Sequence, residues 1–165
     1  MAEPIALDVH AHLIPVNPEG LAGIDGIVWD ADAGVMSIDG HKVGIKTIYK
    51  SSALLNWMDE HAVTHAYVSA PPPTYRQHLP ESEADLWFSY INDELEKACA
   101  ASGGKLTALL HLPTEHPALA VRYAEAAIAK GHRYFAMPSG TGDDRTLSDD
   151  AFIPLWEVLD RSKSF

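Results

Sequence analysis

The sequence predicts an α/β fold built on a parallel sheet. Strand-like apolar runs alternate with amphipathic helical segments four times along the chain. Gly and Pro residues punctuate most of the junctions between these segments. The 165 residues are 47% apolar and 21% charged, which is typical of an ordinary globular domain with a sizeable core. Repeated strand–helix units favour parallel strands joined by right-handed crossovers.

The first unit contains an insertion between its strand and its helix. The strand is predicted over residues 4–10, and a loop rich in Gly, Pro and Asn follows it. An insertion is then expected over about residues 27–45. Two short apolar runs within it, at 27–29 and 35–38, are bounded by Asp and Gly turn residues, which predicts a two-stranded hairpin.

After the insertion, strands and helices alternate regularly. Ser51 and Ser52 are suitable caps for a helix over residues 53–61, which closes the first unit. The elements expected after it are a strand at 64–70, a helix at 82–101, a strand at 105–112, a helix at 117–128, a strand at 133–137 and a helix at 149–161.

Four strand–helix units are half of an eight-unit βα barrel, the (β/α)8 or TIM-barrel fold, which has about 250 residues when complete. We therefore expect residues 1–165 to be the N-terminal half of one barrel domain. A parallel half-sheet leaves two strand edges without partners, which is a liability for a protein that stands alone. We therefore expect the chain to be truncated and to form a homo-oligomer.

Composition and charge exclude several classes of partner. The chain has 12 Lys plus Arg against 23 Asp plus Glu, a net charge of -11, so we expect neither a nucleic-acid nor a membrane partner. The N-terminus lacks the basic region of a signal peptide, and no run approaches the ~20 apolar residues of a membrane span. The single cysteine, Cys99, fits a reducing compartment and a place in the core. A cytoplasmic protein is expected.

The most informative motif is Asp8-Val9-His10-Ala11-His12, at the end of the first predicted strand. Alternation along a strand places Asp8, His10 and His12 on one face. Two neighbouring imidazoles can bind one metal ion, and the carboxyl ends of barrel strands carry the chemistry. His10 and His12 are therefore candidate metal ligands, and Asp8 a hydrogen-bond acceptor beneath them. A solvated or hydrogen-bonded structural pair is the alternative.

Recognition of a substrate carboxylate needs a cation or a polar donor on the same face as the metal. Arg76 lies in the loop after the second strand, and Lys46 lies just after the insertion. His111, at the end of the third strand, could also line the pocket. These three are the candidate substrate-binding residues, although surface charges and a packed histidine are the competing interpretations.

Together these features resemble the amidohydrolase-related (amidohydrolase 2) family, in its branch of aminocarboxymuconate-semialdehyde and resorcylate decarboxylases. The histidine motif with Leu13-Ile14-Pro15 is similar to the start of that family. Three further blocks match in order: Leu54-Leu55-x-x-Met58-Asp59-x-x-x-Val63-Thr64, Leu112-Pro113 with Pro117-x-Leu119-Ala120-Val121, and Phe152-x-Pro154-Leu155-Trp156-x-x-Leu159-Asp160.

The resemblance implies a barrel enzyme that depends on a divalent metal ion, with zinc expected and manganese as the alternative. It implies a carboxy-lyase that decarboxylates an unsaturated or aromatic carboxylic acid, a small-molecule substrate. The remaining ligands and the catalytic base of the family would lie beyond Phe165. Two alternatives stay open: a metal-dependent hydrolase of a lactone or amide on the same scaffold, and a non-catalytic truncated paralogue.

Overall fold

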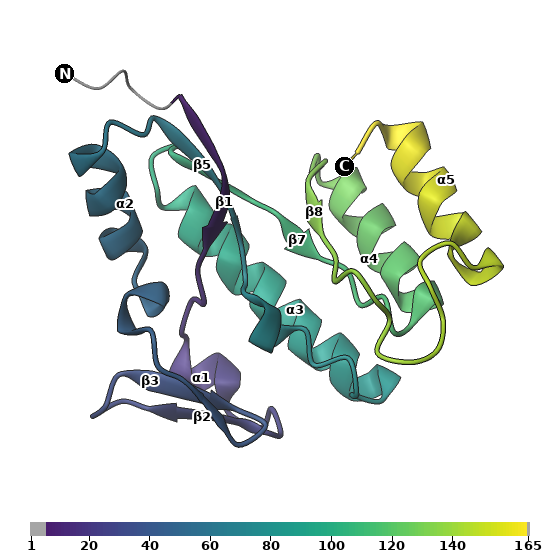
Figure 1. Ribbon diagram of the computed structural model, residues 1–165, viewed down its shortest axis with the longest axis horizontal. Coiled ribbons are helices and arrows are strands. Elements are labelled where there is room, and N and C mark those ends of the chain that lie inside the picture. The colour runs from purple at the N-terminus through teal and green to yellow at the C-terminus, as the bar shows by residue number, and fades with distance from the viewer. Residues whose placement is uncertain (1–5, 165) are drawn as a thin grey trace.

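A computed structural model describes residues 6–164 as an α/β fold whose parallel strands follow one another in chain order (Figure 1). The strands are β1 Leu7–His12, β2 Ile27–Asp30, β3 Val35–Ile38, β4 His41–Val43, β5 His65–Ser69, β6 Leu106–Ala108, β7 Leu110–His111 and β8 Phe135–Ala136. The α-helices are α1 Pro18–Leu21, α2 Ser51–Glu60, α3 Glu81–Ala100, α4 Pro117–Ala129 and α5 Ile153–Ser162. Short 3-10 helices are η1 Lys46–Tyr49, η2 Pro72–Thr74 and η3 Asp150–Phe152.

The parallel pairings connect four strand paths. β1 pairs with β5, β5 pairs with β6, and β7 pairs with β8, all in parallel. β6 and β7 are successive parts of one path, interrupted at Leu109, where the pairing changes from β5 to β8. The predicted parallel pairing of these strands is therefore confirmed. β1 and β8 form the two edges, and their outer sides have no strand partner within residues 6–164.

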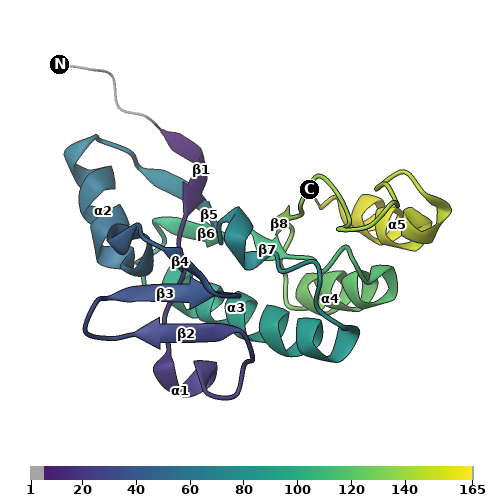
Figure 2. The same ribbon diagram turned by 60° about the horizontal axis from the view of Figure 1, so that its bottom comes forward.

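Three local expectations were wrong. The insertion is a three-stranded antiparallel sheet, β2-β3-β4, because the turn at Asp39-Gly40 folds residues 41–43 back onto β3 (Figure 2). α2 begins at Ser51, so both serines lie inside it, and the cap residue Lys50 makes no side-chain cap. The last helix opens with the 3-10 turn η3. Of the strand expected over residues 4–10, residues 4 and 5 lie outside the described part, and β1 continues through His12.

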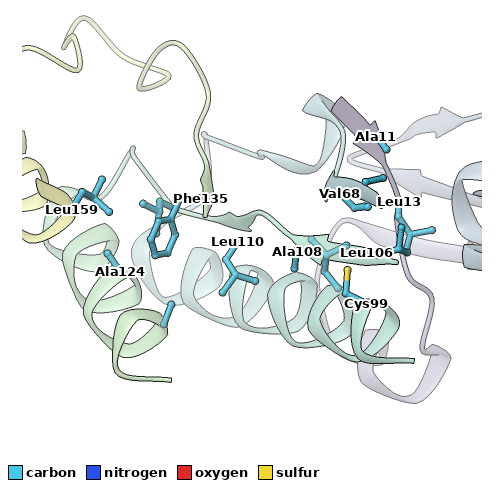
Figure 3. Packing of buried hydrophobic residues seen from close by; sticks show 14 of the residues in the cluster. Ala11, Leu13, Val68, Cys99, Leu106, Ala108, Leu110, Ala124, Phe135 and Leu159 are labelled. Atoms are coloured by element: carbon cyan, nitrogen blue, oxygen red, sulfur yellow. The ribbon is translucent and has the colours of Figure 1, made fainter. Parts of the chain in front are cut away.

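The main core lies between the strands and the helices α3, α4 and α5 (Figure 3). Alternate strand residues enter it, including Ala11, Val68, Leu110 and Phe135, each below 9% exposed. Cys99 of α3 packs there at 7% exposure, and burial raises the pKa of its thiol to about 11. The cysteine is therefore a core residue, as expected, and is held as a neutral thiol.

A second apolar cluster attaches the inserted sheet to α3. Met36 and Ile38 of β3 pack with Trp87 and Ile91 of α3, and Met36, Trp87 and Ile91 are completely buried. The insertion is thereby fixed beside the carboxyl end of β1 (Figure 2). Within residues 6–164 no helix combines the length and apolarity needed to cross a membrane.

Candidate metal centre

The two histidines of β1 lie side by side. Their ring centroids are 4.7 Å apart, with the ring planes at 74°. The pairing between β1 and β5 shifts by one residue between Asp8 and Ala11, which is the signature of a β-bulge. Ala11 enters the core, whereas His10 is exposed and His12 half-exposed. The strand thus presents two imidazoles together on the side away from the helices.

His12 is oriented by the neighbouring strand. Its Nδ1 lies 3.3 Å from the carbonyl oxygen of Ser69 and 3.2 Å from the Ser69 hydroxyl. Because a carbonyl oxygen only accepts hydrogen bonds, this contact favours the tautomer with the proton on Nδ1. The lone pair on Nε2 is then available to a metal ion, an arrangement typical of metal-binding histidines.

Asp8 is hydrogen-bonded to the backbone of the histidine pair. Its carboxylate accepts a hydrogen bond from the backbone N–H of His10, at 2.9 Å. This bond occupies a donor in the irregular part of β1 and so stabilises the bulge. Asp8 therefore supports the backbone of the histidine pair.

The donor set fits a divalent ion in part. Imidazole nitrogens suit zinc and other transition metals, and the pair is close enough to share one ion. Stable zinc sites use three or four protein ligands. No group of three or more His, Cys, Asp and Glu side chains in the described part of the chain is arranged to hold a metal. His10 and His12 would thus supply two ligands, and a stable site would need at least one more from outside the described residues of this one chain.

The ribbon views show α2 beside β1 (Figures 1 and 2). A groove lies between the carboxyl end of β1 and the segment from η1 to α2. It has a volume of about 490 Å³. His12 lines it together with Ile45, Thr47, Ile48, Ala53, Leu54 and Trp57. Trp57 is 42% exposed and presents part of its indole to the groove. Lys46, a predicted substrate-binding residue, is exposed and lies between two of the lining residues in sequence.

Arg76, the second predicted substrate-binding residue, is already paired within the chain. Its guanidinium donates two hydrogen bonds to the carboxylate of Asp39, at 2.6 and 2.9 Å, and one to the carbonyl of Asp25, at 2.8 Å. Its side chain is 3% exposed. The arginine joins the inserted sheet to the loop after β5. We do not carry it forward as a substrate ligand, because its donors and charge are used internally.

His111, the third candidate, is a buried structural contact. Its ring is completely buried, and its Nε2 accepts the backbone N–H of Ala70 at 2.9 Å. Burial, with a smaller contribution from His12, lowers the pKa of His111 to about 3, so the ring is neutral. Its Nδ1 has no partner in the described chain. The sequence did not indicate this contact, which fixes the end of β7 beside the end of β5.

Glu115 was missed altogether. It follows β7, is 6% exposed, and neither carboxylate oxygen has a hydrogen-bond partner among the described residues. Burial raises its pKa to about 7, although Arg145 and His116 lie near enough to oppose the shift. Arg145 donates to the carbonyl of Glu115, at 2.7 Å, rather than to its carboxylate. The sequence offers no signal for this burial, since Glu is normally exposed.

We expect Glu115→Gln to stabilise the protein in a pH-dependent way. The pKa of the Glu115 carboxyl is raised from 4.5 to about 7 in the folded protein. Its contribution to the free energy of unfolding is therefore fully present below pH 4.5 and is lost as the pH rises through 7. The substitution should raise the free energy of unfolding by up to about 3 kcal/mol at pH 8 and by under about 1 kcal/mol at pH 5. Urea unfolding at both pH values measures this. The exposed Glu125→Gln is the control, and an equal gain at both pH values would contradict the prediction.

Comparisons with known proteins match the chain by structure alone. No protein-family model matches it, and no curated protein matches its sequence. Among solved structures, 2,6-dihydroxybenzoate decarboxylase from Rhizobium covers 98% of this chain and 48% of its own, with 15% identity and a TM-score of 0.71. A 5-carboxyvanillate decarboxylase from Novosphingobium aromaticivorans, with bound manganese, covers 98% of this chain and 49% of its own, with 13% identity and a TM-score of 0.73. An amidohydrolase from Mycobacterium avium subsp. paratuberculosis covers 98% of this chain and 57% of its own, with 12% identity and a TM-score of 0.68.

These likenesses confirm, for the fold, the resemblance to decarboxylases of the amidohydrolase type. The chain spans about half the length of the two decarboxylases. At sequence identities of 12–15%, these likenesses establish a shared fold and do not assign roles to individual site residues.

Proposed function

We propose that this chain provides half of a metal-dependent carboxy-lyase that decarboxylates an unsaturated or aromatic carboxylic acid. The observation that carries the proposal is the adjacent His10–His12 pair at the carboxyl end of the first parallel strand. The likeness to decarboxylases supports the reaction class. In this proposal the four parallel strands are the first four of an eight-stranded barrel, and the protein works in the cytoplasm.

A bound divalent ion, with zinc proposed because imidazoles suit it, would act as a Lewis acid on substrate oxygens. His10 and His12 would hold the ion, and the contact of His12 with Ser69 would keep its Nε2 directed at it. The apolar wall of the groove around Trp57 would receive the organic part of the substrate. Lys46 would attract its carboxylate. The remaining ligand and the proton-transfer group are assigned to protein outside the described residues of this one chain.

Hydrolysis of a lactone or amide on the same scaffold is the second candidate, favoured by the likeness to a protein described as an amidohydrolase. The two reactions differ in their products. Release of carbon dioxide from 2,6-dihydroxybenzoate, used as a probe, identifies a carboxy-lyase. Ring or amide opening without gas release identifies a hydrolase.

The metal site is tested by binding alone. We expect the wild-type chain to retain zinc after dialysis, measured by mass spectrometry of the metal. His10→Ala and His12→Ala should each weaken binding by at least about tenfold, since even residues that merely orient ligands change affinity by about 10–100-fold. His61→Ala is the control, because that exposed ring stacks on Trp57 and its Nδ1 donates to the Trp57 carbonyl oxygen at 2.8 Å. Equal zinc content in all four proteins would overturn the proposed site.

A further inference from the structure

The face of the parallel strands turned away from the helices is uncovered. Side chains alternate along these strands, so the neighbours of the buried core residues lie on that other face. On β5 to β8 these residues are half-exposed and include no Asp, Glu, Lys or Arg: His65, Tyr67, Thr107, Leu109, Tyr134 and Ala136. The Tyr67 and Tyr134 rings lie 4.8 Å apart with their planes tilted by 34°, and the His65 ring is hydrogen-bonded to the Thr107 hydroxyl at 2.9 Å. Parallel sheets occur almost only where both faces are covered. Something must therefore close over this face.

The two open edges differ in a complementary way. Beside β1, the groove edge carries Ile45, 62% exposed, next to Lys46 and Lys50, neither of which has an ion-pair partner in the described chain. The face of α5 turned away from α4 carries Ile153, 48% exposed, and, one turn on, Glu157, which has no ion-pair partner in the described chain. Asp160 lies on the same face and pairs with Lys163 at 3.4 Å. A basic edge with Ile45, Lys46 and Lys50 thus stands on the α2 side of the sheet, and an acidic edge with Ile153 and Glu157 stands on the α5 side. Figure 1 shows α2 and α5 at opposite sides of the sheet.

We propose that a second copy of this chain closes the sheet into an eight-stranded barrel. A two-fold axis along the barrel joins the β8–α5 edge of one copy to the β1–α2 edge of the other, and does so twice. Both junctions then pair the basic edge with the acidic edge. Two copies supply eight strands, which matches the span of about half of the similar decarboxylases. The uncovered faces meet inside the closed barrel.

This closure completes the metal site. In the dimer the partner's β1 occupies the fifth strand position. The side chains that fill a barrel come in layers from alternate strands, so the first and fifth strands contribute to the same layer. The interior of an eight-stranded barrel is just wide enough for side chains to fill. Both His10–His12 pairs therefore face one another, and we infer that they share one divalent ion on the axis. Three of these four imidazole nitrogens are enough for a catalytic zinc site, which keeps one position open for the substrate.

The metal part of this inference rests on the proposed role of the histidine pair, whereas the edge part is independent of it. Sedimentation velocity and metal analysis of the 165-residue chain test both. We expect a particle of twice the 18.0 kDa chain mass with one zinc ion per two chains. Ile45→Glu, which introduces an acid at the edge facing Glu157, should give a monomer. The control Val28→Glu, on β2 and 63% exposed, should stay dimeric.

His10→Ala separates the two parts. We expect this variant to remain dimeric and to lose its zinc, because the edges and not the metal hold the copies together. A monomeric wild type would overturn the closure and leave the edges to another protein segment. A wild-type dimer that holds one zinc ion per chain would also overturn the proposal. So would an Ile45→Glu variant that stays dimeric. A dimer that lacks zinc would overturn the shared site together with the proposed function, while the edge pairing would stand.

Discussion

Replacing Arg76 with methionine is expected to lower the free energy of unfolding by about 3 kcal/mol, since removing one partner of a buried ion pair leaves the other charge unpaired. Methionine keeps most of the apolar contact of the side chain with Trp87, over whose ring the guanidinium lies at 5.4 Å. What is lost is the double hydrogen bond to Asp39 and the bond to the Asp25 carbonyl. Urea unfolding measures the difference.

The backbone around this ion pair leaves no room for a side chain at Gly26. Gly26 has a φ of +73°, and a Cβ there would lie 2.3 Å from an Asp39 oxygen and 2.4 Å from an Arg76 nitrogen. Asp39 and Arg76 also have positive φ values, 50° and 42°, which side-chain-bearing residues adopt rarely. The ion pair must offset this local strain.

The exposed pair Arg122–Asp85 provides the matched control, with side chains 59% and 46% exposed. Arg122→Met should cost under about 1 kcal/mol, as surface ion pairs do. The pH dependence gives a second readout. Hydrogen bonding from Arg76 lowers the pKa of Asp39 from 3.8, so the pair stabilises the protein above that value and loses this contribution as pH falls further. Equal losses for Arg76→Met and Arg122→Met would show that the pair does not anchor the insertion.

Local patterns in the sequence were sufficient to predict the main elements. The apolar periodicity of residues 82–101 predicted α3 to within one residue at each end. The alternation Asp8-x-His10-x-His12 predicted neighbouring imidazoles, which the structure has. Both features depend on residues close in sequence, whose geometry follows from the element itself.

Contacts between distant segments were beyond the sequence patterns. The Asp39–Arg76 pair joins residues 37 positions apart, and the contact of His111 with Ala70 spans 41. Only tertiary structure brings such groups together, and a lone Arg or His has the same appearance whether it is a ligand or an internal contact. The pair Asp39-Gly40 was recognised as a turn, but the short strand after it, His41–Val43, has too few residues for a pattern.

Asn92→Leu is expected to destabilise the protein by about 2–5 kcal/mol, because it leaves two buried backbone groups unpaired at about 1–3 kcal/mol each. The side-chain amide of Asn92 donates to the carbonyl of His111 at 2.9 Å and accepts its N–H at 2.8 Å. Asn92 is 6% exposed, so solvent does not replace these bonds from the surface. The amide of α3 thus fixes the end of β7, which in turn holds Ala70 through the His111 ring.

The exposed neighbour Asp93→Leu controls for the change in helix composition and should cost within about 0.5 kcal/mol. Hydrogen exchange tests the mechanism as well as the magnitude. Loss of protection should appear at the His111 and Ala70 amides, while the amides of the inserted sheet stay protected. A cavity of about 190 Å³ adjoins both Asn92 and His111, so an ordered water there could bond the freed groups. If Asn92→Leu lowers the free energy of unfolding no more than Asp93→Leu does, the bonds from Asn92 to the His111 backbone contribute little to stability. Water would then serve the freed backbone groups as well as the amide does.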